Sequence, residues 1–168
     1  MKIALSCDHR GSHLYDSLSE CIRRAGHSLV DVPTCATPQS DYPDLAWYAG
    51  KAVQSGLADR GILVCGSGIG MSIAANKIHG IRAALVHDDI TAEVSRRHND
   101  ANILCLSADM LGQRLIEKII EIWLKTEFEG GRHARRNAKI VAIENDQDPA
   151  TVTNHNGAVA TGETQRAG

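Results

Sequence analysis

The chain has 168 residues, of which 43% are hydrophobic and 23% are charged, and its formal net charge is −2. This length fits one domain with a sizeable core. The charge argues against nucleic acid as a partner, because binding to a phosphate backbone needs a broad basic surface, and the apolar runs are too short for a membrane span.

Strand-like and helix-like segments alternate along the chain. Apolar β-branched runs predict strands and apolar residues at helical spacing predict helices, in this order: strand 2–7, helix 12–25, strand 27–32, loop 33–40, helix 41–56, strand 62–65, helix 72–76, strand 81–86, helix 88–97, strand 102–106, helix 111–126 and helix 132–145. The alternation predicts an α/β fold, a three-layer α/β/α, doubly wound (Rossmann-like) sheet of five parallel strands with an extra C-terminal helix. We expect residues 1–145 to form one domain and residues 146–168, which lack periodicity, to form a poorly packed tail without a catalytic role.

Five scattered cysteines without a C-x-x-C pair indicate free thiols rather than disulfides or a zinc site. Free thiols fit a reducing cytoplasm, and we expect a cytoplasmic protein without a signal peptide. The eight histidines include no H-E-x-x-H pattern, and we expect no metal.

A glycine-rich segment follows the third predicted strand. Cys65 ends the strand, and glycines then alternate with other residues through Gly66, Gly68 and Gly70. Such spacing lets the backbone approach a ligand with its N–H groups turned inward, and a helix start behind it adds a positive field. The segment therefore predicts an anion cradle, and the same field favours the thiolate of Cys65 as a base or nucleophile. The alternatives are a tightly packed turn and an inert buried cysteine.

Further polar residues follow the other strands. Asp8 and His9 come after the first strand and His87 after the fourth. Ligands of doubly wound sheets bind beyond the carboxyl ends of the strands, so these residues are expected to converge with Cys65. Arg132 and Arg136 stand four residues apart on one helix face, an arrangement suited to phosphate capture; the alternative is a solvated basic turn.

Six motifs in order resemble the type B ribose-5-phosphate isomerases and the related galactose-6-phosphate isomerase subunits. They are CDHRG at 7–11, DYPD at 41–44, CGSGIGMSIAANK at 65–77, GIRAAL at 80–85, SRRHNDANIL at 95–104 and EGGRHARR at 129–136. The resemblance implies a cofactor-free isomerase of the pentose phosphate pathway that converts D-ribose 5-phosphate to D-ribulose 5-phosphate through an enediolate. Allose or galactose 6-phosphate is an alternative substrate. A nucleotide-binding or sensory module is disfavoured, because the glycines read G-x-G-x-G after the third strand instead of G-x-G-x-x-G after the first.

The resemblance also implies roles for individual residues. Cys65 would move the proton between C1 and C2, because Met71 stands where family members without this cysteine carry a glutamate. The resemblance further implies that the enediolate oxygens bind to the backbone of Gly66, Gly68, Ile69 and Gly70 and to the hydroxyl of Ser67. His98, beside Asn99, would open the sugar ring, and Asp8, Tyr42 and Asp41 would contact the sugar. His9, Arg132 and Arg136 would bind the phosphate. A partner subunit would supply His98, Asn99 and the two arginines, which implies a homodimer or a tetramer of two dimers.

The chain departs from the family pattern after the fifth strand. The family often has a phosphate-contacting arginine there in a G-x-R pattern, whereas this chain has Ser107, Ala108 and Asp109. The acid implies weaker phosphate affinity, a re-aimed substrate, or an outward-facing Asp109 that caps the next helix. We favour the helix cap, because Leu111 begins the predicted helix.

Overall fold

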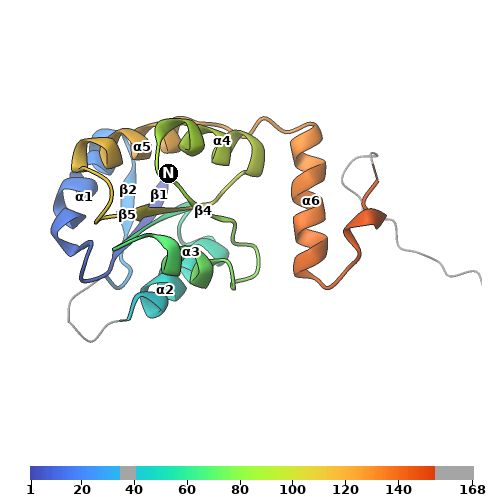
Figure 1. The fold of residues 1–168 in the computed structure, drawn as a ribbon, viewed down its shortest axis with the longest axis horizontal. Helices are drawn as coiled ribbons and strands as arrows, with labels where there is room; N and C mark the ends of the chain where they lie inside the picture. The colour runs from blue at the N-terminus through green and yellow to red at the C-terminus, as the bar shows by residue number, and fades with distance from the viewer. Residues whose placement is uncertain (35–40, 154–168) are drawn as a thin grey trace, which may run out of the picture. The chain divides into compact units, whose positions relative to one another are not determined.

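The computed structural model describes residues 1–34 and 41–153. Its sheet contains the five predicted strands, all parallel, in the order β2-β1-β3-β5-β4 (Figure 1). The strands are β1 (Lys2–Cys7), β2 (Ser28–Val30), β3 (Arg60–Cys65), β4 (Ala83–Leu85) and β5 (Ile103–Ser107). The predicted fold class is thereby confirmed, while most of the predicted loop 33–40, with Cys35, lies outside the described residues.

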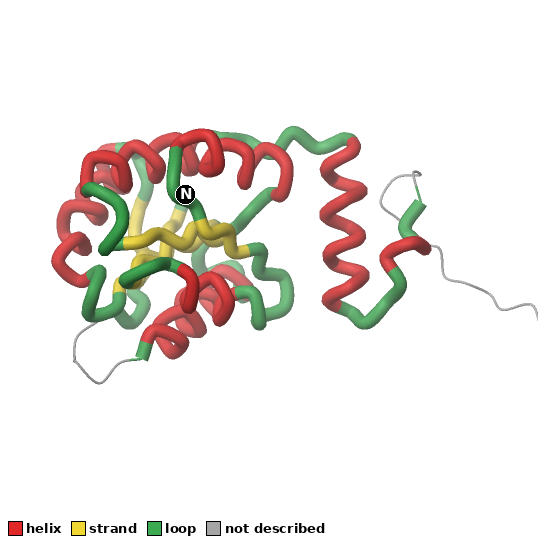
Figure 2. Tube along the Cα trace, in the orientation of Figure 1, coloured by secondary structure: helices red, strands yellow, loops and turns green. Residues whose placement is uncertain are grey.

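The helices follow the predicted order, with differences at their ends (Figure 2). They are α1 (Tyr15–Arg24), α2 (Tyr42–Gln54), α3 (Ile69–Ala75), α4 (Asp89–Asn99), α5 (Gln113–Lys125) and α6 (Arg132–Glu144), with short 3-10 turns η1 (Ser12–Leu14) and η2 (Pro149–Thr151). Helix α3 begins at Ile69, three residues before the predicted start, so Gly70 belongs to its first turn. Helix α4 continues through His98 and Asn99. None of the helices in the described ranges is long and apolar enough to cross a bilayer.

The central strand β3 is buried on both faces of the sheet, which explains its continuous apolar sequence. Ile62 and Val64 pack into the core formed with α1, α4 and α5. Leu63 and Cys65 point the other way, into the core formed with α2 and α3. Figure 1 shows these two groups of helices on opposite faces of the sheet. Because successive side chains of a strand point to opposite faces of the sheet, the Cys65 side chain points toward α2 and α3.

The chain divides into two compact units, Met1–Phe128 with the sheet and α1–α5, and a second unit that starts at Glu129 and contains α6. Residues 146–153, which the sequence assigns to the tail, carry the turn η2. The Asp148 carboxylate accepts the Ala150 N–H at 2.8 Å, and Lys139 of α6 donates to the Pro149 carbonyl at 2.8 Å. The structure thus places this part of the predicted tail in the second unit.

Candidate active site

The order in which the chain adds strands to the sheet reverses between β1 and β3. From β1 the chain continues to β2 at one edge of the sheet, and from β3 it continues to β4 and β5 on the other side. Such a switch point is where open parallel sheets bind ligands. A pocket of about 450 Å³ lies here, and its lining contains seven of the predicted site residues together with Ile73: Asp8, Tyr42, Cys65, Gly66, Ser67, Ile69 and Gly70. The sheet topology therefore brings together residues from β1, α2 and the glycine segment.

The Cys65 thiol lies in the pocket lining with only 5% of the residue exposed. Its Sγ accepts the Gly68 N–H at 3.1 Å, which fixes the position of the sulfur. Cys105 is fully buried in the same core. Burial raises the pKa of Cys105, and the neighbouring Cys65 raises it further, so Cys105 remains a thiol and Cys65 is the sulfur available to the pocket.

Three backbone amides of the pocket lining are open. Within the described residues, the N–H groups of Gly66, Ser67 and Gly70 donate no hydrogen bond. The amides between them are occupied, because Gly68 donates to Cys65 and Ile69 donates to the Ser67 hydroxyl at 3.3 Å. Open amides beside a pocket can stabilise a developing negative charge.

Each glycine of the segment makes room for a specific neighbour. Gly68 has φ +77°, and a Cβ there would lie 2.5 Å from Leu85 Cδ1. A Cβ on Gly70 would lie 2.5 Å from the Tyr42 ring, and one on Gly66 would lie 2.8 Å from an Asp109 carboxylate oxygen. The tightly packed turn and the amide-lined pocket are thus properties of the same segment.

Asp8 and Tyr42 complete the wall of the pocket. The buried Asp8 accepts the N–H groups of Arg10 at 2.8 Å and Gly11 at 3.1 Å through Oδ1, which shapes the turn after β1. Its Oδ2 has no donor within the residues the structure describes, so this oxygen is available to a ligand. The exposed Tyr42 ring lies against Gly70, whereas Asp41 occupies the N-cap position of α2 and does not line the pocket.

Several predicted site residues lie elsewhere in the chain. His9 and His87 are exposed and do not line the pocket. His98 and Asn99 end α4, which returns along the sheet to the start of β5. Cys65 pairs with the last residue of β5, and this strand of five residues spans roughly 17 Å.

His98 and Cys65 of one chain are therefore at opposite ends of the sheet. Arg132 and Arg136 are exposed on α6, in the second unit.

The prediction that Asp109 caps the next helix is wrong. The N-cap of α5 is Gly112, and the Asp109 carboxylate instead pairs with Arg10, at 2.8 Å between Oδ2 and Nη2 and 3.2–3.3 Å to Nε. This pairing raises the pKa of Arg10. Sequence reasoning missed Arg10, because nothing in the local pattern connects two residues 99 positions apart; the unusual acid at position 109 was the only signal.

Ser107 is a second residue that the sequence did not single out. It is fully buried at the end of β5 and donates its hydroxyl to the Gly66 carbonyl at 2.6 Å, while accepting the Met110 N–H at 3.0 Å. The Asp109 N–H also donates to the Gly66 carbonyl, at 3.1 Å. Since C=O and N–H of one planar peptide point in opposite directions, these two bonds fix the direction of the Ser67 amide.

Comparisons with known proteins agree on one family. The model of a family described as Ribose/Galactose Isomerase matches residues 3–140. Ribose-5-phosphate isomerase B of Escherichia coli is 41% identical over 143 residues, which cover 85% of this chain and 96% of that protein. The solved structure of ribose-5-phosphate isomerase B from Clostridium thermocellum has a TM-score of 0.84 at 45% identity, covering 87% of this chain and 99% of that one. The Mycoplasma genitalium enzyme, solved with bound ribulose-5-phosphate, has a TM-score of 0.81 at 39% identity, covering 87% and 97%.

Proposed function

The chain belongs to the ribose/galactose isomerase family, and from this membership and the geometry of its pocket we propose that it interconverts D-ribose 5-phosphate and D-ribulose 5-phosphate. The observation that carries the proposal is the Cys65 sulfur in a pocket lined by the open amides of Gly66, Ser67 and Gly70. An aldose–ketose isomerase needs a base beside C1 and C2 and donors for the enediolate oxygens. The pocket offers both.

Cys65 is the base in this proposal. As a thiolate it takes the proton from C2 of the aldose and returns it at C1, and the reverse reaction uses the same group. Met71, at the position where other family members have a glutamate, is fully buried in the core beneath α3 and offers no ionisable group. Asp8 is not assigned as the base. Its Oδ1 already accepts two backbone N–H groups, and its free Oδ2 is assigned to a sugar hydroxyl.

The open amides and the Ser67 hydroxyl hold the enediolate oxygens. Each preorganised donor of this kind contributes about 3 kcal/mol to the stability of a transition state. Tyr42 packs against the sugar from the side of α2, with Asp41 nearby, and Arg132 and Arg136, together with His9, hold the phosphate. Binding of the remote phosphate then orients the reacting carbons.

We also propose that a second copy of the chain completes the site. His98, assigned to ring opening, and its neighbour Asn99 lie at the far end of the sheet from Cys65 in one chain. Large apolar side chains are exposed beside the pocket, namely Tyr42, Ile69 and Ile73, and such a patch is typical of a protein interface. A homodimer or a tetramer of two dimers would cover it, and the cytoplasm is the proposed location.

The test of the base is the substitution Cys65→Ala. It removes the proton acceptor without filling the pocket, so kcat should fall about a thousandfold while the protein remains folded. Rates are measured by the appearance of ketose from D-ribose 5-phosphate, and incorporation of solvent deuterium at C1 of the ketose reports the proton transfer itself.

Cys105→Ala is the matched control, because this second cysteine lies in the same core but outside the pocket lining. Its kcat should stay close to that of the unmodified protein. Equal losses in the two variants would assign the effect to packing and remove Cys65 as the base.

A six-carbon phosphate, allose or galactose 6-phosphate, is the second candidate substrate. The observation that favours it is Asp109, which stands where an arginine contacts the phosphate in the family pattern and which pairs with Arg10 here. Comparison of kcat/KM for five- and six-carbon aldose phosphates decides between them; a higher value for either six-carbon sugar would replace the ribose assignment.

A further inference from the structure

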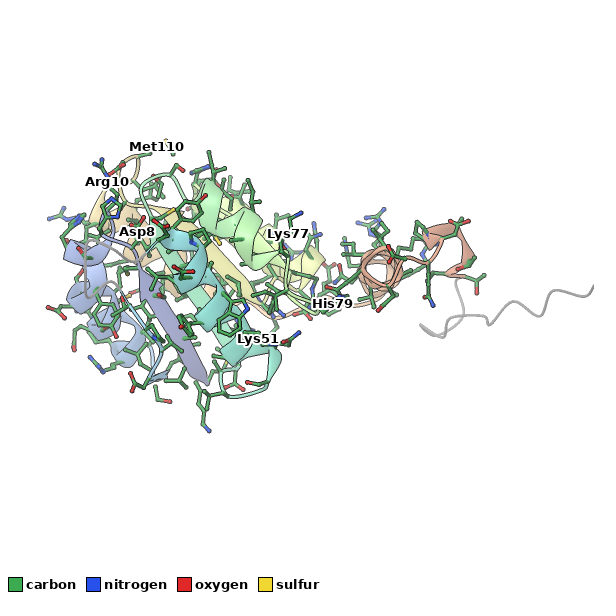
Figure 3. The ribbon with its side chains drawn as sticks, turned by 90° about the horizontal axis from the view of Figure 1, so that it is seen from below. Asp8, Arg10, Lys51, Lys77, His79 and Met110 are labelled. Carbon is green, nitrogen blue, oxygen red and sulfur yellow. The ribbon has the colours of Figure 1, made fainter. Side chains whose placement is uncertain are left out.

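The side chain of Arg10 lies against Gly66, beside the residues that line the pocket. Its backbone N–H binds Asp8, which lines the pocket, and its Cγ lies 3.6 Å from the position of a Cβ on Gly66, which also lines it. Figure 3 shows Arg10 on the same side of the first unit as Asp8 and Met110. The guanidinium is therefore at the carboxyl edge of the sheet, beside the candidate active site.

Asp109 fixes one edge of this guanidinium and leaves the other open. Nε and Nη2 donate to the carboxylate, whereas Nη1 donates to nothing in the part of the chain that the structure describes. The side chain of Arg10 is 56% exposed and that of Asp109 is 41% exposed, so a ligand can reach the pair. A guanidinium with one edge anchored keeps a second, terminal edge oriented for another oxyanion.

We propose that Arg10, held in place by Asp109, binds the phosphate group of the substrate with the terminal edge of its guanidinium. The inference rests on the proposed function, because it takes the substrate to be a sugar phosphate. Asp109 is a positioning residue: it anchors Arg10 at the cost of a negative charge near the phosphate. Arg10 offsets that charge, so the pair matters for binding through its geometry and not through a net positive charge.

The substitution Arg10→Ala tests the contact. It removes the donors and leaves the Asp109 carboxylate unpaired near the phosphate, so KM for D-ribose 5-phosphate should rise about tenfold or more, while kcat changes little. The double variant Arg10→Ala/Asp109→Ala removes the repulsion too, and its KM should lie between those of the unmodified protein and Arg10→Ala. Asp109→Asn keeps an acceptor for Arg10 without the charge, and its KM should be no higher than that of the unmodified protein.

Arg24→Ala is the matched control, because Arg24 is a similarly exposed arginine that pairs with Glu117 and does not line the candidate site. A surface ion pair with a purely structural role would leave KM unchanged in all of these variants, and that result would overturn the inference.

Binding of inorganic phosphate, followed by ³¹P NMR, separates the inference from the proposed function. Absence of turnover in the unmodified protein contradicts the proposed function alone. Equal phosphate binding by the unmodified protein and Arg10→Ala contradicts the role of Arg10, whereas weaker binding by Arg10→Ala supports it.

Discussion

Ser107 connects the end of β5 to the glycine segment through a single buried hydroxyl. Ser107→Ala leaves the Gly66 carbonyl with one donor, the Asp109 N–H, and deprives the Met110 N–H of its acceptor. We expect the free energy of unfolding to fall by about 1–2 kcal/mol, and kcat to fall about tenfold, because a misdirected Ser67 amide loses part of its proposed contact with the enediolate. KM should change less than kcat.

Ser17→Ala is a suitable control, since the Ser17 hydroxyl also donates to a backbone carbonyl, that of Leu14, but on α1. It should lower stability without lowering kcat. Denaturant unfolding and steady-state rates of both variants provide the comparison, and an unchanged kcat in Ser107→Ala would show that the Ser67 amide does not depend on this hydroxyl.

At the residue level, the sequence predicted which residues lie in one pocket better than it predicted contacts between individual side chains. Cys65, Asp8 and Tyr42 meet in one pocket as expected, because their positions after parallel strands or at a helix start constrain where they lie. The contacts of Asp109 with Arg10 and of Ser107 with Gly66 were not predictable in the same way. They depend on how two loops far apart in the sequence approach each other, which strand and helix periodicity does not encode.

The start of α3 is the element whose boundary depends most on glycine. Gly68 adopts φ +77° as the N-cap, and a Cβ there would meet Leu85 at 2.5 Å and the Leu106 backbone at 3.1 Å. Gly68→Ala should therefore cost about 2–4 kcal/mol, the sum of backbone strain and overpacking.

Gly80 offers a matched control for this prediction. It has φ +79°, close to that of Gly68, but nothing lies within 4 Å of a Cβ there. Gly80→Ala should thus cost only about 1 kcal/mol, the strain alone. Chemical denaturation of both variants measures the difference, and equal losses would mean that Leu85 and Leu106 yield to the added methyl group.

The helix start also shows a limit of pattern reading at the level of elements. The sequence predicts α3 from Ser72, because glycines at 66, 68 and 70 are poor helix formers. In the structure the helix begins at Ile69 and includes Gly70, where a Cβ would lie 2.5 Å from the Tyr42 ring. The close approach of α2 therefore accounts for a poor helix former in the first turn of α3.

At the scale of the whole molecule, the doubly wound parallel sheet was predictable as a class from the alternation of strands and helices, and the strand order seen in the structure then placed the pocket. The proposed division of catalytic groups between chains is not a property of one chain's periodicity. In the sequence it was implied only by the family resemblance, and the folded topology supports it by placing His98 and Cys65 at opposite ends of the sheet.

A mixing experiment tests whether two copies share each site. Cys65→Ala and His98→Asn should each be nearly inactive alone. If every site uses Cys65 of one copy and His98 of the other, a mixed dimer has one intact site and one doubly altered site. Equal amounts of the two variants, allowed to exchange subunits at random, form about one half mixed dimers and so should regain about one quarter of the activity of the unmodified protein.

The double variant Cys65→Ala/His98→Asn, mixed with Cys65→Ala, is the control for this experiment, because no combination of these two chains restores a complete site. Activity is measured before and after exchange, with the dimer fraction determined by sedimentation equilibrium. A restored rate only in the first mixture supports a shared site. If exchanged dimers stay as inactive as the separate variants, each chain contains its own complete site, and the assignment of His98 to ring opening across the interface is wrong.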